Sequence, residues 1–197
     1  MAEMRFNIPL RAQNLEDATF VWDTSYSNIL MRDDLGTYVQ TDNDVTITDG
    51  AVRSFVKTTV DFLYPFTIEF HTIIDGMAYG EVKFWMENSQ TAWTYRYIYV
   101  IAKIIGITES GTETEFGTYT TDESSIYLDQ LALSPANQAT TAFPLFIEID
   151  NKILNETQKL IYRIETYVKA HSYSGSVELQ MQIEKNIDET FIKLPIV

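Results

Sequence analysis

The chain has 197 residues, of which 45% are hydrophobic and 21% are charged, and its formal net charge is −14. This length can bury a sizeable core, and the composition is typical of a folded protein rather than a disordered one. The negative charge makes binding to nucleic acid or to an anionic membrane surface unfavourable, and the absence of cysteine excludes disulfides and thiolate metal sites.

The N-terminal sequence contains no apolar stretch of signal-peptide length. No apolar run elsewhere approaches the ~20 residues that span a bilayer. We therefore expect a protein made inside a cell, without a signal peptide or a transmembrane segment. No linker rich in Pro, Gly or Ser divides the chain, so we expect one domain over residues 1–197.

Apolar and polar residues alternate with a period of two along most of the chain, and this pattern predicts β-strands. The expected strands cover 4–10, 45–48, 52–60, 60–72 (bent or divided at Pro65), 79–87, 93–108, 126–133, 143–149, 160–170, 177–183 and 190–197. Turn signals stand at Asp49-Gly50, Asp75-Gly76 and Asp150-Asn151. Roughly ten strands with little helix predict an all-β fold, an antiparallel and jelly-roll-like sandwich.

The densest run, 93–108, alternates Trp and Tyr with smaller residues, and both of its faces become apolar near 98–101. Because a strand covered on both faces lies inside a sheet, we expect this strand to be central.

Two strands, 160–170 and 177–183, flank a Ser-Gly turn and admit two arrangements. As a hairpin they would place Ala170 opposite Leu179, so that the apolar faces coincide. In a jelly roll the two strands would instead enter opposite sheets, and their apolar faces would meet across the core.

Residues 109–125 are rich in Thr, Glu, Gly and Ser, unlike the strands around them. We interpret them as a polar excursion, either a protruding hairpin or a mobile loop. Loops often carry function, so this segment is the candidate interaction loop. Its candidate residues are Glu109, Thr112, Glu115, Phe116 and Tyr119.

The sequence offers little for catalysis. Its two histidines, His71 and His171, have no metal-ligand spacing to other donors, and no G-x-S-x-G motif is present. Glu69 and Glu81 could form a glycosidase carboxylate pair, but outward Glu is common on the strands of an acidic protein. The acidic loop 42–44 could hold a hard cation, although a solvated turn is the simpler interpretation. We therefore predict no enzyme activity, no catalytic residue, no cofactor and no metal site.

As a Cys-free, acidic sandwich rich in Thr and Tyr, the chain resembles in style the jelly-roll and β-sandwich structural proteins of virus particles. This resemblance implies that loops such as 109–125 reach neighbours and that the terminal segments 1–15 and 191–197 tie subunits together. The implied function is a non-enzymatic capsid, turret, neck or tail component that assembles in the host cytoplasm. Its implied partners are copies of itself, as a homo-oligomer, and other structural proteins of the particle.

A carbohydrate-binding module is the alternative interpretation. It would use exposed aromatic rings to stack on sugar, and Trp85 and Trp93 are the candidate residues.

Overall fold

A computed structural model describes residues 6–14, 28–32, 45–64, 72–88, 94–128, 138–154, 159–171, 177–182 and 190–196. Within these ranges the chain forms twelve strands and no helix, and therefore no helical segment of the length and apolarity that crosses a membrane. The strands are β1 (Phe6–Asn14), β2 (Asn28–Arg32), β3 (Val45–Thr46), β4 (Val56–Leu63), β5 (Thr72–Asn88), β6 (Thr94–Ile107), β7 (Glu113–Thr120), β8 (Ser124–Leu128), β9 (Gln138–Leu154), β10 (Lys159–Ala170), β11 (Val177–Met181) and β12 (Phe191–Ile196).

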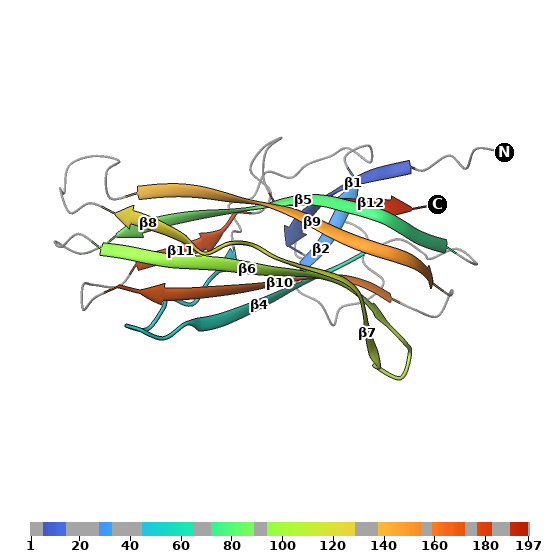
Figure 1. Ribbon diagram of the computed structural model, residues 1–197, viewed down its shortest axis with the longest axis horizontal. Coiled ribbons are helices and arrows are strands. Elements are labelled where there is room, and N and C mark those ends of the chain that lie inside the picture. Colours follow the sequence, from blue (N-terminus) through green and yellow to red (C-terminus); the bar gives the residue numbers. More distant parts are fainter. Residues whose placement is uncertain are drawn as a thin grey trace.

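The strands form the two layers of a sandwich (Figure 1). In one layer β5 lies between β9 on one side and β11 and β12 on the other. In the second layer β10 lies between β4 and β6, and β6 also pairs with β7 and β8. The all-β antiparallel sandwich predicted from the sequence is thus confirmed, and β6 is central, as expected.

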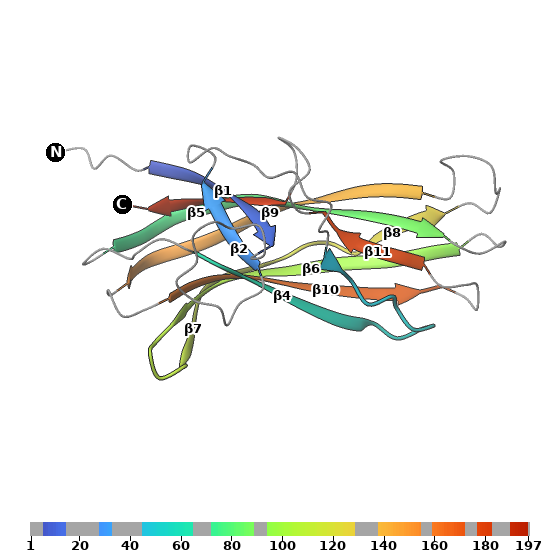
Figure 2. The same cartoon turned by 180° about the vertical axis from the view of Figure 1, so that it is seen from behind.

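One side of the sandwich is closed by backbone pairing. β1 pairs with β12 and with β2, and β2 forms a short parallel ladder with β4. β2 therefore passes from one layer to the other, as the view from behind also shows (Figure 2). Hydrogen-bonded strands therefore follow one another without a break from one layer to the other on this side.

The opposite side is a seam where β7 meets β9 without a ladder between them in the described ranges. Gly117 makes the approach possible, because a Cβ atom there would lie 2.5 Å from the carbonyl oxygen of Glu148 and 2.7 Å from Cγ2 of Ile147. Tyr119 reaches across the same seam to the ring of Phe146, at a centroid distance of 5.9 Å. At this seam the layers are thus joined by close packing at Gly117 and by the contact of two aromatic rings, in place of backbone hydrogen bonds.

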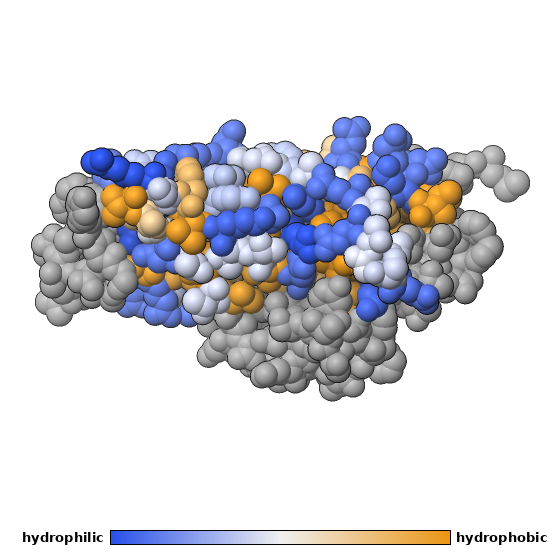
Figure 3. Space-filling view, turned by 90° about the horizontal axis from the view of Figure 1, so that it is seen from below, coloured by the Kyte–Doolittle hydropathy of each residue, from blue (hydrophilic) through white to orange (hydrophobic). Residues whose placement is uncertain are grey.

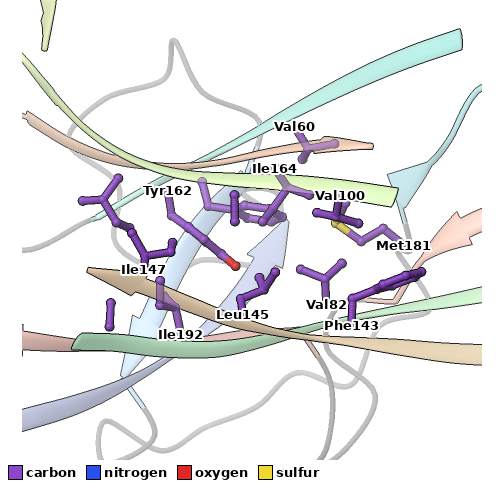
Figure 4. Packing of buried hydrophobic residues seen from close by; sticks show 14 of the residues in the cluster. Val60, Val82, Val100, Phe143, Leu145, Ile147, Tyr162, Ile164, Met181 and Ile192 are labelled. Carbon is purple, nitrogen blue, oxygen red and sulfur yellow. The ribbon is translucent and has the colours of Figure 1, made fainter. Parts of the chain in front are cut away.

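Every second side chain of a strand points into the space between the layers and helps to fill it, as the sequence predicts. In β6 the inward residues are fully buried, and in β9 each inward residue alternates with an exposed one. The rings of Phe84 and Phe143 meet edge to face across β5 and β9, with centroids 5.8 Å apart. Figure 4 shows this packing at close range, with residues of both layers pointing toward one another.

Of the two arrangements left open for 160–170 and 177–183, the structure excludes the hairpin and shows the two strands in opposite layers. β10 uses both of its edges to pair with β4 and β6, whereas β11 pairs with β5 and β3 in the other layer. The apolar faces of the two strands therefore face the core from opposite sides.

The turns expected at Asp75-Gly76 and Asp150-Asn151 are also wrong, because β5 and β9 run straight through both positions. They form an irregularity in the ladder, where Gly76 has φ 117° and Asn151 has φ 38°. The backbone N–H of Asn151 donates to Oδ1 of Asp75 at 3.1 Å, which fixes the two polar residues opposite each other. Turn residues here mark a β-bulge rather than a reversal of the chain.

Asp49-Gly50 does not form the expected hairpin turn either. The Asp49 carboxylate accepts two hydrogen bonds from the buried Arg96 guanidinium, at 2.6 and 2.9 Å, and one from the backbone N–H of Val177 at 3.1 Å. Gly50 lies so close to β10 that a Cβ atom would be 2.5 Å from the carbonyl oxygen of Val168. This segment therefore clamps β6, β10 and β11 together.

Candidate functional site

The outer face of the β4–β10–β6 layer carries four aromatic rings and one lysine that contacts them. We call this group the aromatic face: Phe55, Tyr97, Tyr99, Tyr167 and Lys169. Tyr99 and Tyr167 are stacked, with centroids 4.6 Å apart and planes inclined by 4°, and Phe55 contacts Tyr99 edge to face at 5.0 Å. The Lys169 ammonium lies 4.3 Å from the Phe55 centroid and 4.8 Å from that of Tyr97. These rings pack on one another and on a cation, an arrangement that stabilises a sheet surface.

Ion pairs continue this face beyond the rings. The Glu165 carboxylate is 2.7 Å from Nζ of Lys57 and 3.5 Å from Nζ of Lys103. Burial raises the pKa of Glu165, but hydrogen bonds and charge attraction from the two lysines outweigh it, and the pKa ends below its ordinary value. The hydrogen bond to Glu165 raises the pKa of Lys57 in turn.

Arg163 forms the second set of ion pairs. Its guanidinium donates to both oxygens of Asp61, at 2.6 and 2.8 Å, and to both oxygens of Glu113, at 2.8 and 2.9 Å. The hydrogen bond from Arg163 lowers the pKa of Glu113. Charges of opposite sign therefore compensate one another on this face, and Figure 3, which views this side, shows polar and apolar residues intermingled along it.

The histidine on this face does not form part of a reactive cluster among the described residues. His171 is exposed, its Nδ1 lies 3.3 Å from the hydroxyl of Tyr97, and its ring contacts those of Tyr95 and Tyr97 at 5.9 Å. No group of three or more His, Cys, Asp or Glu residues in the described ranges could hold a metal ion. His71, Glu69 and the loop 42–44 lie outside those ranges, so the predictions of no catalytic residue, cofactor or metal remain predictions.

The outer face of the other layer differs, because its hydrophobic side chains are exposed. Every large hydrophobic residue that is exposed within the described ranges belongs to β5 or β9: Met77 (50%), Tyr79 (38%), Phe146 (44%) and Ile153 (51%). Tyr79 lies opposite Phe146 in the ladder, and their ring centroids are 5.4 Å apart.

Phe191 of β12 extends this group, with its ring 5.8 Å from that of Tyr79. We call Met77, Tyr79, Phe146 and Phe191 the apolar patch. A contiguous exposed apolar area of this kind marks an interaction surface more often than scattered single residues do.

The sequence gives only a faint signal for this patch. Outward positions of β9 hold Pro144, Phe146 and Glu148, so a single Phe stands in an otherwise unremarkable outer row. The three strands that form the patch are distant in the sequence, and only their pairing brings Phe146, Tyr79 and Phe191 together.

The candidate interaction loop divides into two groups. Glu109, Thr112 and Glu115 are exposed on the β6–β7 hairpin, which protrudes from the sandwich in Figure 1. Phe116 is the extra residue of a bulge, and its ring covers Gly106 so closely that a Cβ atom there would collide with the ring. Tyr119 packs at the seam, so the two aromatic residues of the loop already contact the core.

Only one of the two candidate glycan-stacking residues lies within the described ranges. Trp85 is partly exposed on the outer face of β5, opposite Thr140 and Gln180. Trp93 lies outside the described residues. The carbohydrate-binding interpretation therefore stays a prediction.

No protein-family model and no curated protein matches the chain. Two solved structures of a CocE/NonD family hydrolase from Staphylococcus aureus match it with a TM-score of 0.46 at 12% and 11% identity. Each match covers 98% of this chain, but only 37% and 36% of the hydrolase chain. The chain thus spans little more than a third of the length of that hydrolase.

A structure of infectious bursal disease virus, Gx strain, aligns with a TM-score of 0.15 at 10% identity, over 100% of this chain and 60% of the viral chain. Similarities at these scores support no conclusion about function. The sandwich rests on the structure of the chain itself, and the resemblance to virion proteins stays a prediction.

Proposed function

We propose that the protein is a non-enzymatic structural protein that acts through protein–protein contacts made by the outer face of β5, β9 and β12. The observation that supports this proposal is the segregation of the large exposed hydrophobic residues, since all of those in the described ranges lie on β5 and β9. Exposed apolar area next to water costs free energy that contact with a partner recovers.

The setting that we propose is a virus particle, in agreement with the acidic, Cys-free, Thr- and Tyr-rich sequence. Structural proteins of particles need a rigid scaffold and specific contact surfaces rather than a reactive cleft. The two-layer sandwich is such a scaffold, and the apolar patch, supported by ring contacts, is such a surface.

The test is mass spectrometry of particles purified from cells that carry the gene. We expect the chain at a fixed copy number per particle. We also expect a Phe146→Glu chain to be depleted from particles, because a carboxylate at the centre of the patch would be buried without a partner on contact. The matched control is Thr118→Glu, which adds the same charge at an exposed position of β7 opposite Lys103.

Thermal unfolding of both variants separates loss of contact from loss of folding. Particles of normal composition and infectivity that lack the chain would contradict the proposed function.

A further inference from the structure

We infer that the partner of the apolar patch is a second copy of this chain, bound face to face as a symmetric dimer. The inference rests on the proposed function and adds to it the identity and geometry of the partner.

The rings of the patch are already held in place. Phe146 contacts Tyr79 at 5.4 Å and Tyr119 at 5.9 Å, and Tyr79 contacts Phe191 at 5.8 Å. Rings that are fixed before binding lose little side-chain entropy on association, which favours contact through this surface.

Charge favours a second copy over a charged partner. The chain carries a net charge of −14, so two copies repel each other over most of their surfaces. Beside the patch, however, the described charged residues are of both signs: Asp75, Glu81, Glu148 and Asp150 together with Lys83 and Lys193. An apolar surface whose rim carries both signs can be complementary to a second copy of itself.

The order of the strands brings groups that attract each other into contact when two copies meet face to face. The row Phe146, Tyr79, Lys193 runs across β9, β5 and β12, and Glu148 follows Phe146 on β9. In a face-to-face dimer the two-fold axis lies in the plane of the interface. With that axis along the strands, β12 of one copy covers β9 of the other, and the exposed Lys193 comes over Phe146 and Glu148 of the second copy.

In this arrangement each part of the surface makes a favourable contact with the second copy. The Lys193 ammonium meets an aromatic ring and a carboxylate, both of which attract a cation. The apolar patch of one copy covers that of the other, as in the core of an interface. A patch of four large residues is small compared with the ~800 Å² that each partner contributes to a standard interface, so we expect a dimer that dissociates on dilution.

The experiment measures the mass of the purified chain by sedimentation velocity and light scattering, from low micromolar to near-millimolar concentration. We expect a reversible monomer–dimer equilibrium. Tyr79→Glu should weaken it more than about tenfold, because Tyr79, at the middle of the row, faces its own copy across the two-fold axis and like charges would then oppose each other in an apolar contact. Thr118→Glu, on the other layer, should leave the equilibrium unchanged.

A charge-swap experiment tests the geometry. Lys193→Glu and Glu148→Lys should each weaken self-association, because each places like charges opposite one another. Mixed in equal amounts, the two variants should form a heterodimer, because opposite charges then meet at both contacts. The carboxylate introduced at position 193 of one chain faces the ammonium introduced at position 148 of the other, and the second contact pairs the native Lys193 with the native Glu148. Circular dichroism confirms that each variant is folded.

A wild-type chain that stays monomeric throughout the concentration range would overturn the inference, as would an oligomer that is insensitive to both Tyr79→Glu and the charge swap. Neither result contradicts the proposed function. That function is tested by the presence of the chain in particles and by the depletion of the Phe146→Glu variant from them. A monomeric chain whose Phe146→Glu variant is still excluded from particles would assign the patch to a different structural protein.

Discussion

At the residue scale, the core contains a polar atom that the described residues leave without a hydrogen-bond partner. The hydroxyl of Tyr162 points from β10 into the space between the layers, near Leu145 (Figure 4). Tyr162 is 1% exposed, and burial raises its pKa. The ring itself packs against Phe62, with centroids 6.1 Å apart, so the aromatic part contributes to the core while the oxygen opposes folding.

Replacing Tyr162 by Phe removes that oxygen and keeps the ring. We expect Tyr162→Phe to raise the free energy of unfolding by about 1 kcal/mol, because an unpaired buried hydroxyl costs roughly 1–3 kcal/mol. Equilibrium unfolding in urea measures the change. Phe62→Leu is the control, and we expect it to destabilise the protein because it removes ring packing at the same place. A clear loss of stability in Tyr162→Phe would mean that the hydroxyl has a hydrogen-bond partner, either a buried water molecule or a residue outside the described ranges.

At the scale of elements, prediction from the sequence worked where the signal is local. The period of two located β6 and β10 to within a few residues, since one face of each strand is buried along its length. Strand pairing was not predictable in the same way, because a strand with an apolar face suits any partner with a matching face. β10 and β11 therefore agree with a hairpin in sequence while lying in opposite layers.

For the candidate site, too, local features could be predicted from the sequence and contacts between distant segments could not. The composition of 109–125 leaves both a protruding hairpin and a mobile loop open, and the structure shows a hairpin. The inward role of Phe116 and Tyr119 was not predictable, since it depends on Gly106 opposite the bulge and on β9 across the seam. The apolar patch was missed for the same reason, because three distant strands assemble it.

The seam between β7 and β9 gives a prediction at this scale. We expect Gly117→Ala to lower the free energy of unfolding by about 1–3 kcal/mol, because the added methyl group would push β7 away from the Glu148 carbonyl. Thermal or urea unfolding measures the loss. Thr118→Ala, at the next and exposed position of β7, should change stability by less than about 0.5 kcal/mol. Equal effects of the two substitutions would contradict the role of Gly117 as the point of closest approach.

At the scale of the whole molecule, two electrostatic effects oppose each other as the pH falls. Protonation of carboxylates reduces the repulsion within a chain of net charge −14. Protonation of Glu165 and Glu113 also breaks their contacts with Lys57, Lys103 and Arg163. The pKa values of both carboxylates are lower in the folded protein than their ordinary value of 4.5, so the unfolded chain binds more protons in mild acid.

The contribution of these pairs is therefore complete above the ordinary carboxyl pKa of 4.5 and is lost as the pH falls through the lowered folded values. We expect Glu165→Gln to reduce stability at pH 7 and to flatten the acid limb of a plot of stability against pH. Urea unfolding at a series of pH values measures both. Glu109→Gln, a loss of the same charge on the exposed β6–β7 turn, serves as the control. An acid limb that Glu165→Gln leaves as steep as before would show that other carboxylates govern acid unfolding.

The pairing of β1 with β12 also bears on how the chain folds. The two strands lie near opposite ends of the sequence, and β1 is one of the strands that join the layers. Pairings between such distant segments must close long loops before they gain contacts, so folding in milliseconds to seconds is expected rather than in microseconds. On the ribosome, β1 emerges long before β12 and finds this partner only when β12 has been made, so the side of the sandwich that β1 helps to close forms only after β12 has followed it.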